Sequence, residues 1–223
     1  MPVVTVRVDP GTGSSQSSGH QEIVLHGPIS HTLAGFAQRD DLLVIGTGKT
    51  GFIHARGYGA RGIQIASSTR SSVAVVPDVD LRFRAGVIAG IDHAETAELV
   101  ASVAGAEAAA LGEPLQLIHS SFGRESAKAP SELATAAATV KNRWPGLVVR
   151  TRITARPPAE ALLDASRNAT ILVLGPGCSQ PDSPFALVIH DVLVNINAPV
   201  LIARMAFASA EPPADRLTLS TKE

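Results

Sequence analysis

Residues 85–120, AGVIAGIDHAETAELVASVAGAEAAALGEPLQLIHS, decide the fold class, because they join two short apolar runs through one long helical stretch. The runs 86–91 and 115–119 are typical of buried strands. Between them, apolar residues recur at helical spacing, at Leu99, Val103, Ala106 and Ala110. Since parallel neighbouring strands need a crossover connection of this kind, the segment predicts a βαβ unit in a parallel sheet.

The same alternation continues toward the C-terminus. Further strands are predicted near 147–153, 170–174 and 199–203, with helices near 131–144, from the Pro157–Pro158 pair onward, and near 186–195. Strands this apolar are expected to be covered on both faces. The predicted fold class is therefore α/β, with a doubly wound parallel sheet of five strands.

An internal repeat precedes this unit. A shift of 129 residues places segment 22–46 on segment 151–175 without a gap, and a shift of 127 places 72–76 on 199–203. The first shift superposes Pro28 on Pro157, Val44 on Val173 and Gly46 on Gly175. Any two βαβ units share some likeness, but here the order and type of the elements also agree. A strand–helix–strand unit and a final strand are therefore expected to occur twice.

The first copy is shorter than the second, because it has no room for a second strand and its two flanking helices. Residues 3–8 are expected to form its first strand, and the Gly- and Ser-rich segment 11–19 reads as a loop. We expect an abbreviated domain at 1–80, a complete domain at 81–208 and a mobile tail at 209–223.

Composition narrows the classes of function. The chain has 19 basic and 20 acidic residues without a run of either sign, so neither nucleic acid nor a membrane surface is an expected partner. Cys178 is the only cysteine, and the N-terminus lacks a signal-peptide pattern, which favours the cytoplasm. The apolar runs are shorter than the roughly 20 residues of a membrane span. The seven histidines show no paired ligand spacing, so no metal site is predicted.

Several segments together resemble the universal stress protein domain. They are 85–120, PPAEALLDASRNATILVLGPG (157–177) and NINAPVLIAR (195–204) in the complete copy, with DDLLVIGTGKTGF (40–52) and SSVAVVP (71–77) in the first. The resemblance implies strand order 3-2-1-4-5, a ligand site at the carboxyl ends of the strands and pairing of two domains through their fifth strands. It also implies ATP binding in one branch of the family.

In that branch an acidic residue after the first strand contacts the nucleoside, and a glycine-rich loop after the fourth strand wraps the phosphates. Glycines permit close backbone approach, and N–H groups near a helix start favour anions. The residues that match this pattern are the candidate cofactor-binding residues: Asp9, Gly46, Gly48, Lys49, Gly51, Gly59 and Ala60 in the first copy, and Asp92 in the complete copy. ATP or AMP is therefore expected in the N-terminal copy.

Two candidates have ordinary alternatives. Lys49 lies in GTGKT, but a P-loop would need a glycine where Leu43 stands, so a solvated lysine is as good an interpretation. Asp92 is also a typical cap for the following helix. In the complete copy Cys178 replaces a loop glycine and no glycine follows Gly177, so no nucleotide cofactor is expected there.

The sequence thus predicts a regulatory, nucleotide-responsive binding module and no enzyme, since no catalytic residue can be named. The alternative is a dimerisation or interaction scaffold that binds no nucleotide. The strands at 73–76 and 200–202 are the expected last strands of the two copies, and apolar edges favour pairing. We expect a homodimer or an intramolecular pairing of the two copies through these strands.

Overall fold

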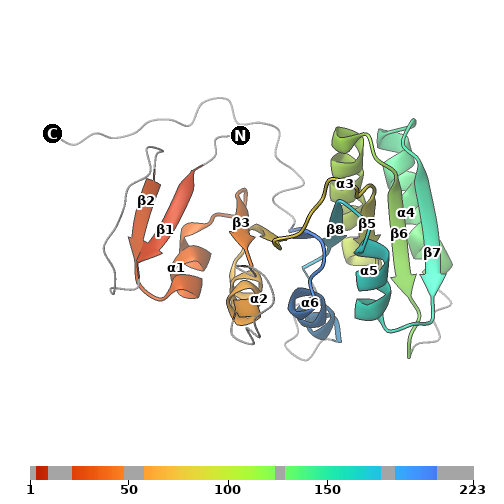
Figure 1. Cartoon of the computed structure of the whole chain (residues 1–223). Coiled ribbons are helices and arrows are strands. Elements are labelled where there is room, and N and C mark those ends of the chain that lie inside the picture. Colours follow the sequence, from red (N-terminus) through yellow and green to blue (C-terminus); the bar gives the residue numbers. More distant parts are fainter. Residues whose placement is uncertain (1–3, 10–21, 48–57, 124–128, 177–183, 205–223) are drawn as a thin grey trace.

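The described residues of the C-terminal half form five strands and four helices. A computed structural model describes residues 4–9, 22–47, 58–123, 129–176 and 184–204 (Figure 1). The elements of this half are β5 (Val87–Gly90), α3 (Ala94–Leu111), β6 (Leu115–Ser120), α4 (Ala129–Arg143), β7 (Val149–Thr154), α5 (Pro158–Ser166), β8 (Ile171–Leu174), α6 (Pro184–Val194) and β9 (Val200–Ile202). The α/β fold class and the predicted strands of this half are confirmed.

The N-terminal half forms a shorter series of elements. They are β1 (Thr5–Asp9), β2 (Glu22–His26), α1 (Ile29–Phe36), β3 (Leu42–Gly46), α2 (Tyr58–Ser68) and β4 (Ser72–Val76). The helices α1 and α5 begin at residues 29 and 158, which the shift of 129 superposes. The division into domains at residue 80 stays a prediction, because one sheet runs across that position.

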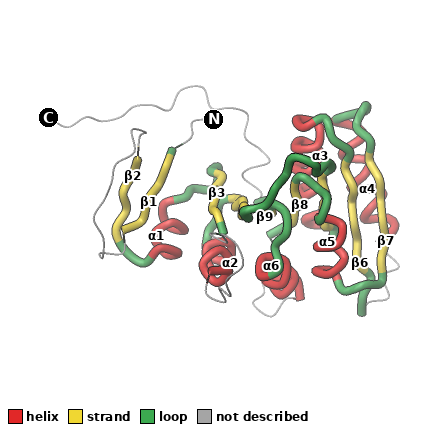
Figure 2. Tube along the Cα trace, in the orientation of Figure 1, coloured by secondary structure: helices red, strands yellow, loops and turns green. Residues whose placement is uncertain are grey.

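The main sheet contains seven strands in the order β3-β4-β9-β8-β5-β6-β7 (Figures 1 and 2). Counted within the C-terminal half alone, its five strands follow the order 3-2-1-4-5, and they are parallel to one another. β4 pairs with β9 in the antiparallel direction, with Val73 opposite Ile202 and Val75 opposite Val200. The last strands of the two copies therefore meet inside the chain.

This antiparallel pairing sets the directions of the two halves. Because β3 is parallel to β4, and β5 and β8 are parallel to β9, the strands of the two halves run in opposite directions. The carboxyl end of β3 and the carboxyl end of β5 consequently lie at opposite edges of the sheet. Ligand sites at these ends would be separate from each other.

Two hydrophobic layers stabilise the sheet. Helices α3 and α4 pack on one face, against the fully buried side chains of Val87, Ala89, Leu115 and Leu117. Helices α2, α5 and α6 pack on the other face, against side chains such as Leu172. Burial of this kind contributes about 25 cal/mol per Å² of apolar surface removed from water.

The buried face of α3 differs from the predicted stripe. Leu99 and Val103 are buried, but Ala106 and Ala110 are exposed, so this part of the prediction is wrong. Small residues such as Ala104 and Ala108 face the sheet instead, because they allow the helix to pack closely.

Arg204 links the two halves just beyond β9. Its backbone N donates to Ser72 Oγ at 2.9 Å, and its guanidinium donates to the carbonyl oxygens of Ser71, at 2.9 Å, and Ala66. Burial lowers the pKa of Arg204. Hydrogen bonds from a charged group to buried carbonyls stabilise more than neutral ones, so Arg204 fastens the C-terminal half to α2 and β4.

The described strands of the N-terminal half lie in two different sheets. β1 pairs with β2 in a separate parallel sheet of two strands, whereas β3 and β4 belong to the main sheet. In the C-terminal half the corresponding first strand, β5, lies between β6 and β8. The split therefore falls between β1 and β3, whose counterparts β5 and β8 pair in the C-terminal half, whereas β1 pairs directly with β2, the counterpart of β7.

Candidate functional site

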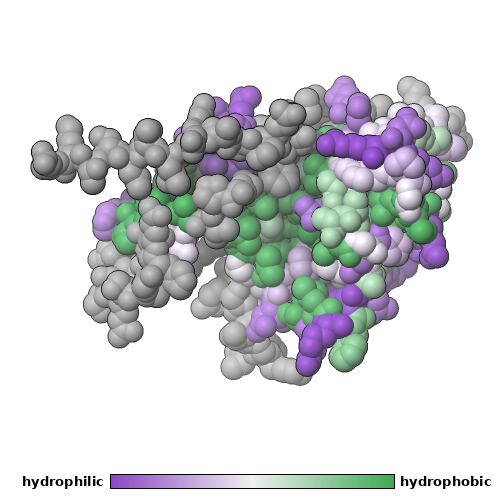
Figure 3. All heavy atoms as spheres, turned by 90° about the horizontal axis from the view of Figure 1, so that it is seen from above, coloured by the Kyte–Doolittle hydropathy of each residue, from purple (hydrophilic) through white to green (hydrophobic). Residues whose placement is uncertain are grey.

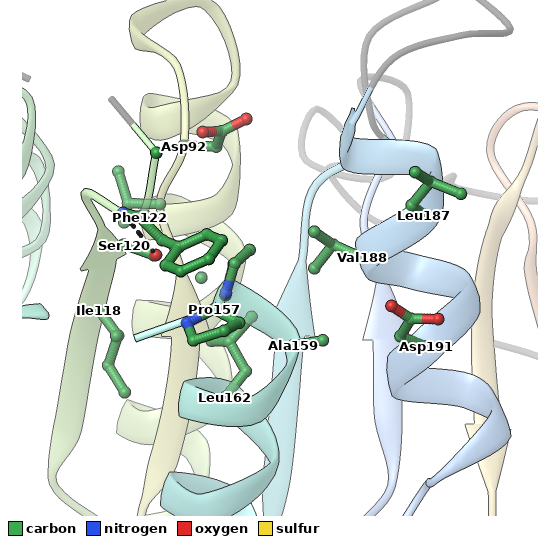
Figure 4. A pocket seen from close by; sticks show the side chains of 14 residues that line it. Asp92, Ile118, Ser120, Phe122, Pro157, Ala159, Leu162, Leu187, Val188 and Asp191 are labelled. Atoms are coloured by element: carbon green, nitrogen blue, oxygen red, sulfur yellow. Dashed lines mark hydrogen bonds between the residues drawn. The ribbon is translucent and has the colours of Figure 1, made fainter. Parts of the chain in front are cut away.

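The structure places a cavity of about 360 Å³ at the carboxyl end of β5 (Figure 4). Its walls come from the ends of β5 and β6, the first two turns of α5 and one side of α6. The residues that line it are Gly90, Ile91, Asp92, Ile118, Ser120, Phe122, Gly123, Pro157, Pro158, Ala159, Leu162, Leu187, Val188 and Asp191. This is the edge of an open α/β sheet at which ligands generally bind.

The floor of the cavity is apolar and closely packed. Ile118 projects from β6, Leu162 from α5 and Val188 from α6, and all three are buried. Gly90 ends β5 beneath them, and a Cβ at this position would lie 2.9 Å from Leu174 Cδ2 and 3.2 Å from Leu162 Cδ2. A glycine therefore allows α5 to approach the sheet here.

Two large apolar side chains lie at the mouth of the cavity. Phe122 follows β6 and is 55% exposed, while Leu187 on α6 is 65% exposed. The ring of Phe122 lies over the cavity in Figure 4. Its backbone N donates to Ser120 Oγ at 3.3 Å, and this hydroxyl donates to the carbonyl oxygen of Arg156 at 2.7 Å. The loop that carries the ring is thus tied to the start of α5.

Carboxylates are the charged groups on the described lining. Asp92 follows β5, and its Oδ2 lies 3.0 Å from His93 Nε2. Asp191 projects from α6, and its Oδ1 lies 3.3 Å from Nδ1 of the neighbouring His190. Because His93, not Asp92, takes the N-cap position of α3, the alternative that Asp92 serves as the N-cap residue is wrong.

The lining of the cavity offers hydrogen-bond acceptors and apolar surface to a ligand. The carboxylates of Asp92 and Asp191 and the hydroxyl of Ser120 can accept hydrogen bonds from a ligand, and the described lining residues include no lysine, arginine or histidine. Ligands with hydroxyl or amino donors suit such a surface, whereas phosphate groups close to the carboxylates are repelled. Mostly apolar walls with a few polar groups are typical of small-molecule sites.

The structure separates the sequence-predicted residues of the N-terminal copy. Asp9 ends β1 and Gly46 ends β3, but these strands lie in different sheets. Gly59 and Ala60 lie in the first turn of α2. Gly48, Lys49 and Gly51 lie outside the described residues. In the C-terminal half, pairing of β5 with β8 brings Asp92 close to the end of β8. No such pairing of β1 with β3 brings Asp9 close to the loop after β3.

The described part of the N-terminal half contains an open groove elsewhere. It has a volume of about 780 Å³, lies between α1 and α2, and is lined by residues that include Pro28, His31 and Gln64. Ser30 Oγ donates to Gln64 Oε1 at 3.1 Å across this groove. None of its lining residues is a sequence-predicted site residue.

Sequence reasoning found Asp92 but missed the rest of the cavity. Phe122 could have been noticed as an aromatic residue just after a strand, at the edge where ligands bind. Asp191 and Val188 gave no such signal, because which side of α6 faces the cavity depends on helix packing. No nucleotide cofactor was predicted in this half on the basis of the loop after Gly177, and residues 177–183 lie outside the described residues.

Two further findings concern other classes of site. In the described ranges, no group of three or more His, Cys, Asp or Glu side chains is placed to hold a metal ion. No described helix is both long and apolar enough to cross a membrane.

Comparisons with known proteins agree with this fold. No family model matches the chain. Universal stress proteins of Mycobacterium tuberculosis and Mycobacterium bovis are each 28% identical to it over 212 residues, which cover 85% of this chain and 67% of theirs. The crystal structure of a universal stress protein from Archaeoglobus fulgidus matches 83% of this chain and 70% of its own, with a TM-score of 0.65 and 16% identity.

An α/β sheet with a cavity at the carboxyl end of β5, the middle one of the five strands of the C-terminal half, is thus combined with sequence similarity that extends across both halves. The resemblance to the universal stress protein family is confirmed over most of the chain.

Proposed function

We propose that this chain is a regulatory binding module that holds an adenine nucleoside or nucleotide in the cavity after β5 and releases it unchanged. The observation that carries the proposal is the cavity itself, with Asp92 just after β5 and Phe122 at the mouth. Its volume of about 360 Å³ falls in the range of ligand pockets, roughly 300–1,000 Å³.

Each part of the ligand has a matching surface. The Asp92 carboxylate can accept hydrogen bonds from ribose hydroxyl groups, and the exposed ring of Phe122 offers a face on which a base can stack. The buried side chains of Leu162 and Val188 provide apolar contact below. Adenine, rather than another base, is proposed from the family resemblance.

Phosphate groups would point out of the cavity. The carboxylates of Asp92 and Asp191 disfavour phosphate at the described walls, and the segment after Gly177 contains no glycine to wrap a phosphate chain. We therefore expect affinity to fall in the order adenosine, AMP, ATP. Absence of turnover is proposed because the described lining itself contains no histidine or lysine. The neighbouring His93 and His190 contact the carboxylates of Asp92 and Asp191, and the Ser120 hydroxyl donates to the carbonyl oxygen of Arg156, so no described histidine at this site is paired with a nucleophile.

The N-terminal nucleotide site stays a second proposal for the same class of ligand. Its glycines at 48 and 51 and Lys49 favour phosphate, in contrast to the acidic cavity after β5. The two sites would therefore differ in ligand preference, and they would lie at opposite edges of the sheet because the halves are antiparallel.

The alternative function is an interaction scaffold, alone or as a homodimer. The observation that favours it is the incomplete cover of β3, where Val44 is 60% exposed. Apolar side chains of the described residues also gather over the middle of the molecule, where the two halves join (Figure 3). Such surfaces often contact a partner.

Calorimetric titration with adenosine, AMP and ATP tests the proposal. Wild type should bind adenosine, and Asp92→Asn should weaken binding by about 1.5–3 kcal/mol, roughly tenfold to a hundredfold, because a charged acceptor is lost. Phe122→Ala should weaken it by about 1–3 kcal/mol through loss of stacking.

Matched controls are available in the linker before β5. Asp78→Asn and Phe83→Ala change an exposed aspartate and a phenylalanine that is 91% exposed, neither of which lines the cavity. Both variants should bind like wild type. Absence of binding by any of the three ligands would overturn the proposal and leave the scaffold alternative.

A further inference from the structure

The outer strand β7 leaves one edge of the main sheet open. β7 pairs with β6 and with no other described strand, and it lies at the end of the seven-stranded order (Figure 1). Leu115 N donates to the carbonyl of Val148, and Ser121 N donates to that of Thr154. In a parallel ladder this pattern turns the N–H and C=O groups of residues 149, 151 and 153 toward the open edge.

One face of this edge is a mostly apolar groove, in which Lys141 and Thr151 are the polar lining residues. Val149, Thr151 and Ile153 are in register with Leu115, Leu117 and His119, so they share the sheet face on which α4 packs. A groove of about 620 Å³ separates β7 from α4, and Ile153 in it is 47% exposed. Small side chains on α4 leave the groove open, namely Ala134, Ala137 and Ala138.

The opposite face of the same strand is basic. Arg150 and Arg152 are exposed and in register with Gln116 and Ile118. Neither guanidinium forms an ion pair with a described residue, whereas the nearby Arg156 pairs with Glu160 and Asp164. Two positive charges two residues apart therefore stand on one face of an open strand.

From these observations we propose that β7 accepts an extended segment of a partner protein in which acidic and apolar residues alternate. Added as a further strand, this segment would place its apolar side chains toward the groove beside α4 and its carboxylates beside Arg150 and Arg152. Main-chain hydrogen bonds to residues 149, 151 and 153 give affinity, and the two unlike faces give specificity.

Charge decides between this occupant and a second copy of the chain. Pairing of two β7 strands would bring four arginines, two from each copy, to one seam, and like charges on neighbouring strands are destabilising. Charged residues on an edge strand can also serve only to prevent aggregation. The experiment must therefore separate a binding edge from an edge that is merely protected.

The probe is a synthetic peptide of eight residues, acetylated and amidated at its ends, in which Glu and Val alternate. Titrated into the full chain, it should bind saturably, and hydrogen exchange of the amides at 149, 151 and 153 should slow by at least about tenfold. Amides at 150 and 152, already bonded to β6, should change much less. A peptide with Lys in place of Glu should not bind.

Two comparisons separate strand addition from simple attraction of charge. The double variant Arg150→Glu/Arg152→Glu should bind the acidic peptide about tenfold more weakly, whereas the matched double variant Arg39→Glu/Arg70→Glu, at exposed arginines of the N-terminal half, should bind it like wild type. The same acidic peptide with alternate amides N-methylated, so that it cannot pair along one edge, should lose binding.

Three outcomes would overturn the proposal. One is no binding of the acidic peptide, which would leave the arginines as protection of the edge. Another is equal binding of the N-methylated peptide without protection at 149, 151 and 153. The third is equal loss of binding in both double variants, because it would show attraction to net charge instead of to β7.

Discussion

Val44 and Val173 occupy equivalent positions in the two halves, yet Val44 is 60% exposed and Val173 is 0% exposed. Both are central residues of corresponding strands, β3 and β8. The difference arises because α3 and α4 cover the sheet face of the C-terminal half, and the described residues of the N-terminal half include no counterpart of these helices. A repeated sequence thus specifies the same element twice, while the rest of the chain decides how deeply each one is buried.

The largest expected effect comes from a charge placed at these equivalent positions. Val173→Asp would bury an unpaired carboxylate and should reduce the free energy of unfolding by on the order of 4 kcal/mol or more. Val44→Asp should change it by less than about 0.5 kcal/mol, because water can reach the new group. Chemical denaturation of both variants measures the two changes in the free energy of unfolding. Equal decreases would show that the sheet face around Val44 is covered in solution.

A smaller effect is expected at the junction of the halves. Arg204→Ala would leave the carbonyl oxygens of Ser71 and Ala66 without their partner and should reduce the free energy of unfolding by about 2–3 kcal/mol. Arg39→Ala, at an exposed arginine of the N-terminal half, is the matched control. If hydrogen exchange in α2 and β4 were the same in Arg204→Ala and wild type, Arg204 would not fasten the halves together.

Two glycines within helices should respond in opposite directions. Gly105 on α3 faces Trp144, and a Cβ there would lie 2.6 Å from Trp144 Cζ3, so Gly105→Ala should destabilise by about 1–3 kcal/mol. Gly35 on α1 has open space, so Gly35→Ala should stabilise by about 0.5–1 kcal/mol. Thermal unfolding measures both, and stabilisation by Gly105→Ala would contradict the close packing of the C-terminal half.

The smallest expected effect depends on pH. Burial raises the pKa of Glu107 on α3, so the folded state binds its proton more tightly than the unfolded state does. At low pH Glu107 is protonated in both states and does not change the free energy of unfolding. As the pH rises through the raised pKa, the buried carboxylate ionises and lowers the free energy of unfolding. Glu107→Gln should therefore stabilise by a few tenths of a kcal/mol at pH 7 and have no effect near pH 3. An equal effect of Glu107→Gln at pH 7 and at pH 3 would show that ionisation of Glu107 does not cause the change in stability.

Much of the C-terminal half could be predicted from its sequence. Its strands are continuous apolar runs, and its helix boundaries carry strong signals such as the Pro157–Pro158 pair and Gly112, which adopts a positive φ of 68° after α3. In the N-terminal half, the internal repeat correctly predicted α1 and β3 from their counterparts α5 and β8. These signals are local, so they do not depend on how distant elements pack.

Other features depended on packing that no local pattern reports. The separation of β1–β2 from β3 is one such feature, because the sequence shows that the first copy is short without showing which of its strands pair. The cavity joins Asp92 to side chains of α5 and α6 that are distant in sequence. The buried side of α3 contains alanines, which are too small to mark a face by hydrophobicity alone.

The location of ligand binding tests the central claim most directly. Adenosine titrated into the isotopically labelled full chain should shift the backbone amide signals of Gly90, Asp92, Phe122 and Ala159 together, with one dissociation constant, because these residues surround one cavity. Signals of α1 and β3 should not move. Shifts confined to the N-terminal half, or no shifts at millimolar adenosine, would contradict the assignment of the nucleoside site to the cavity after β5.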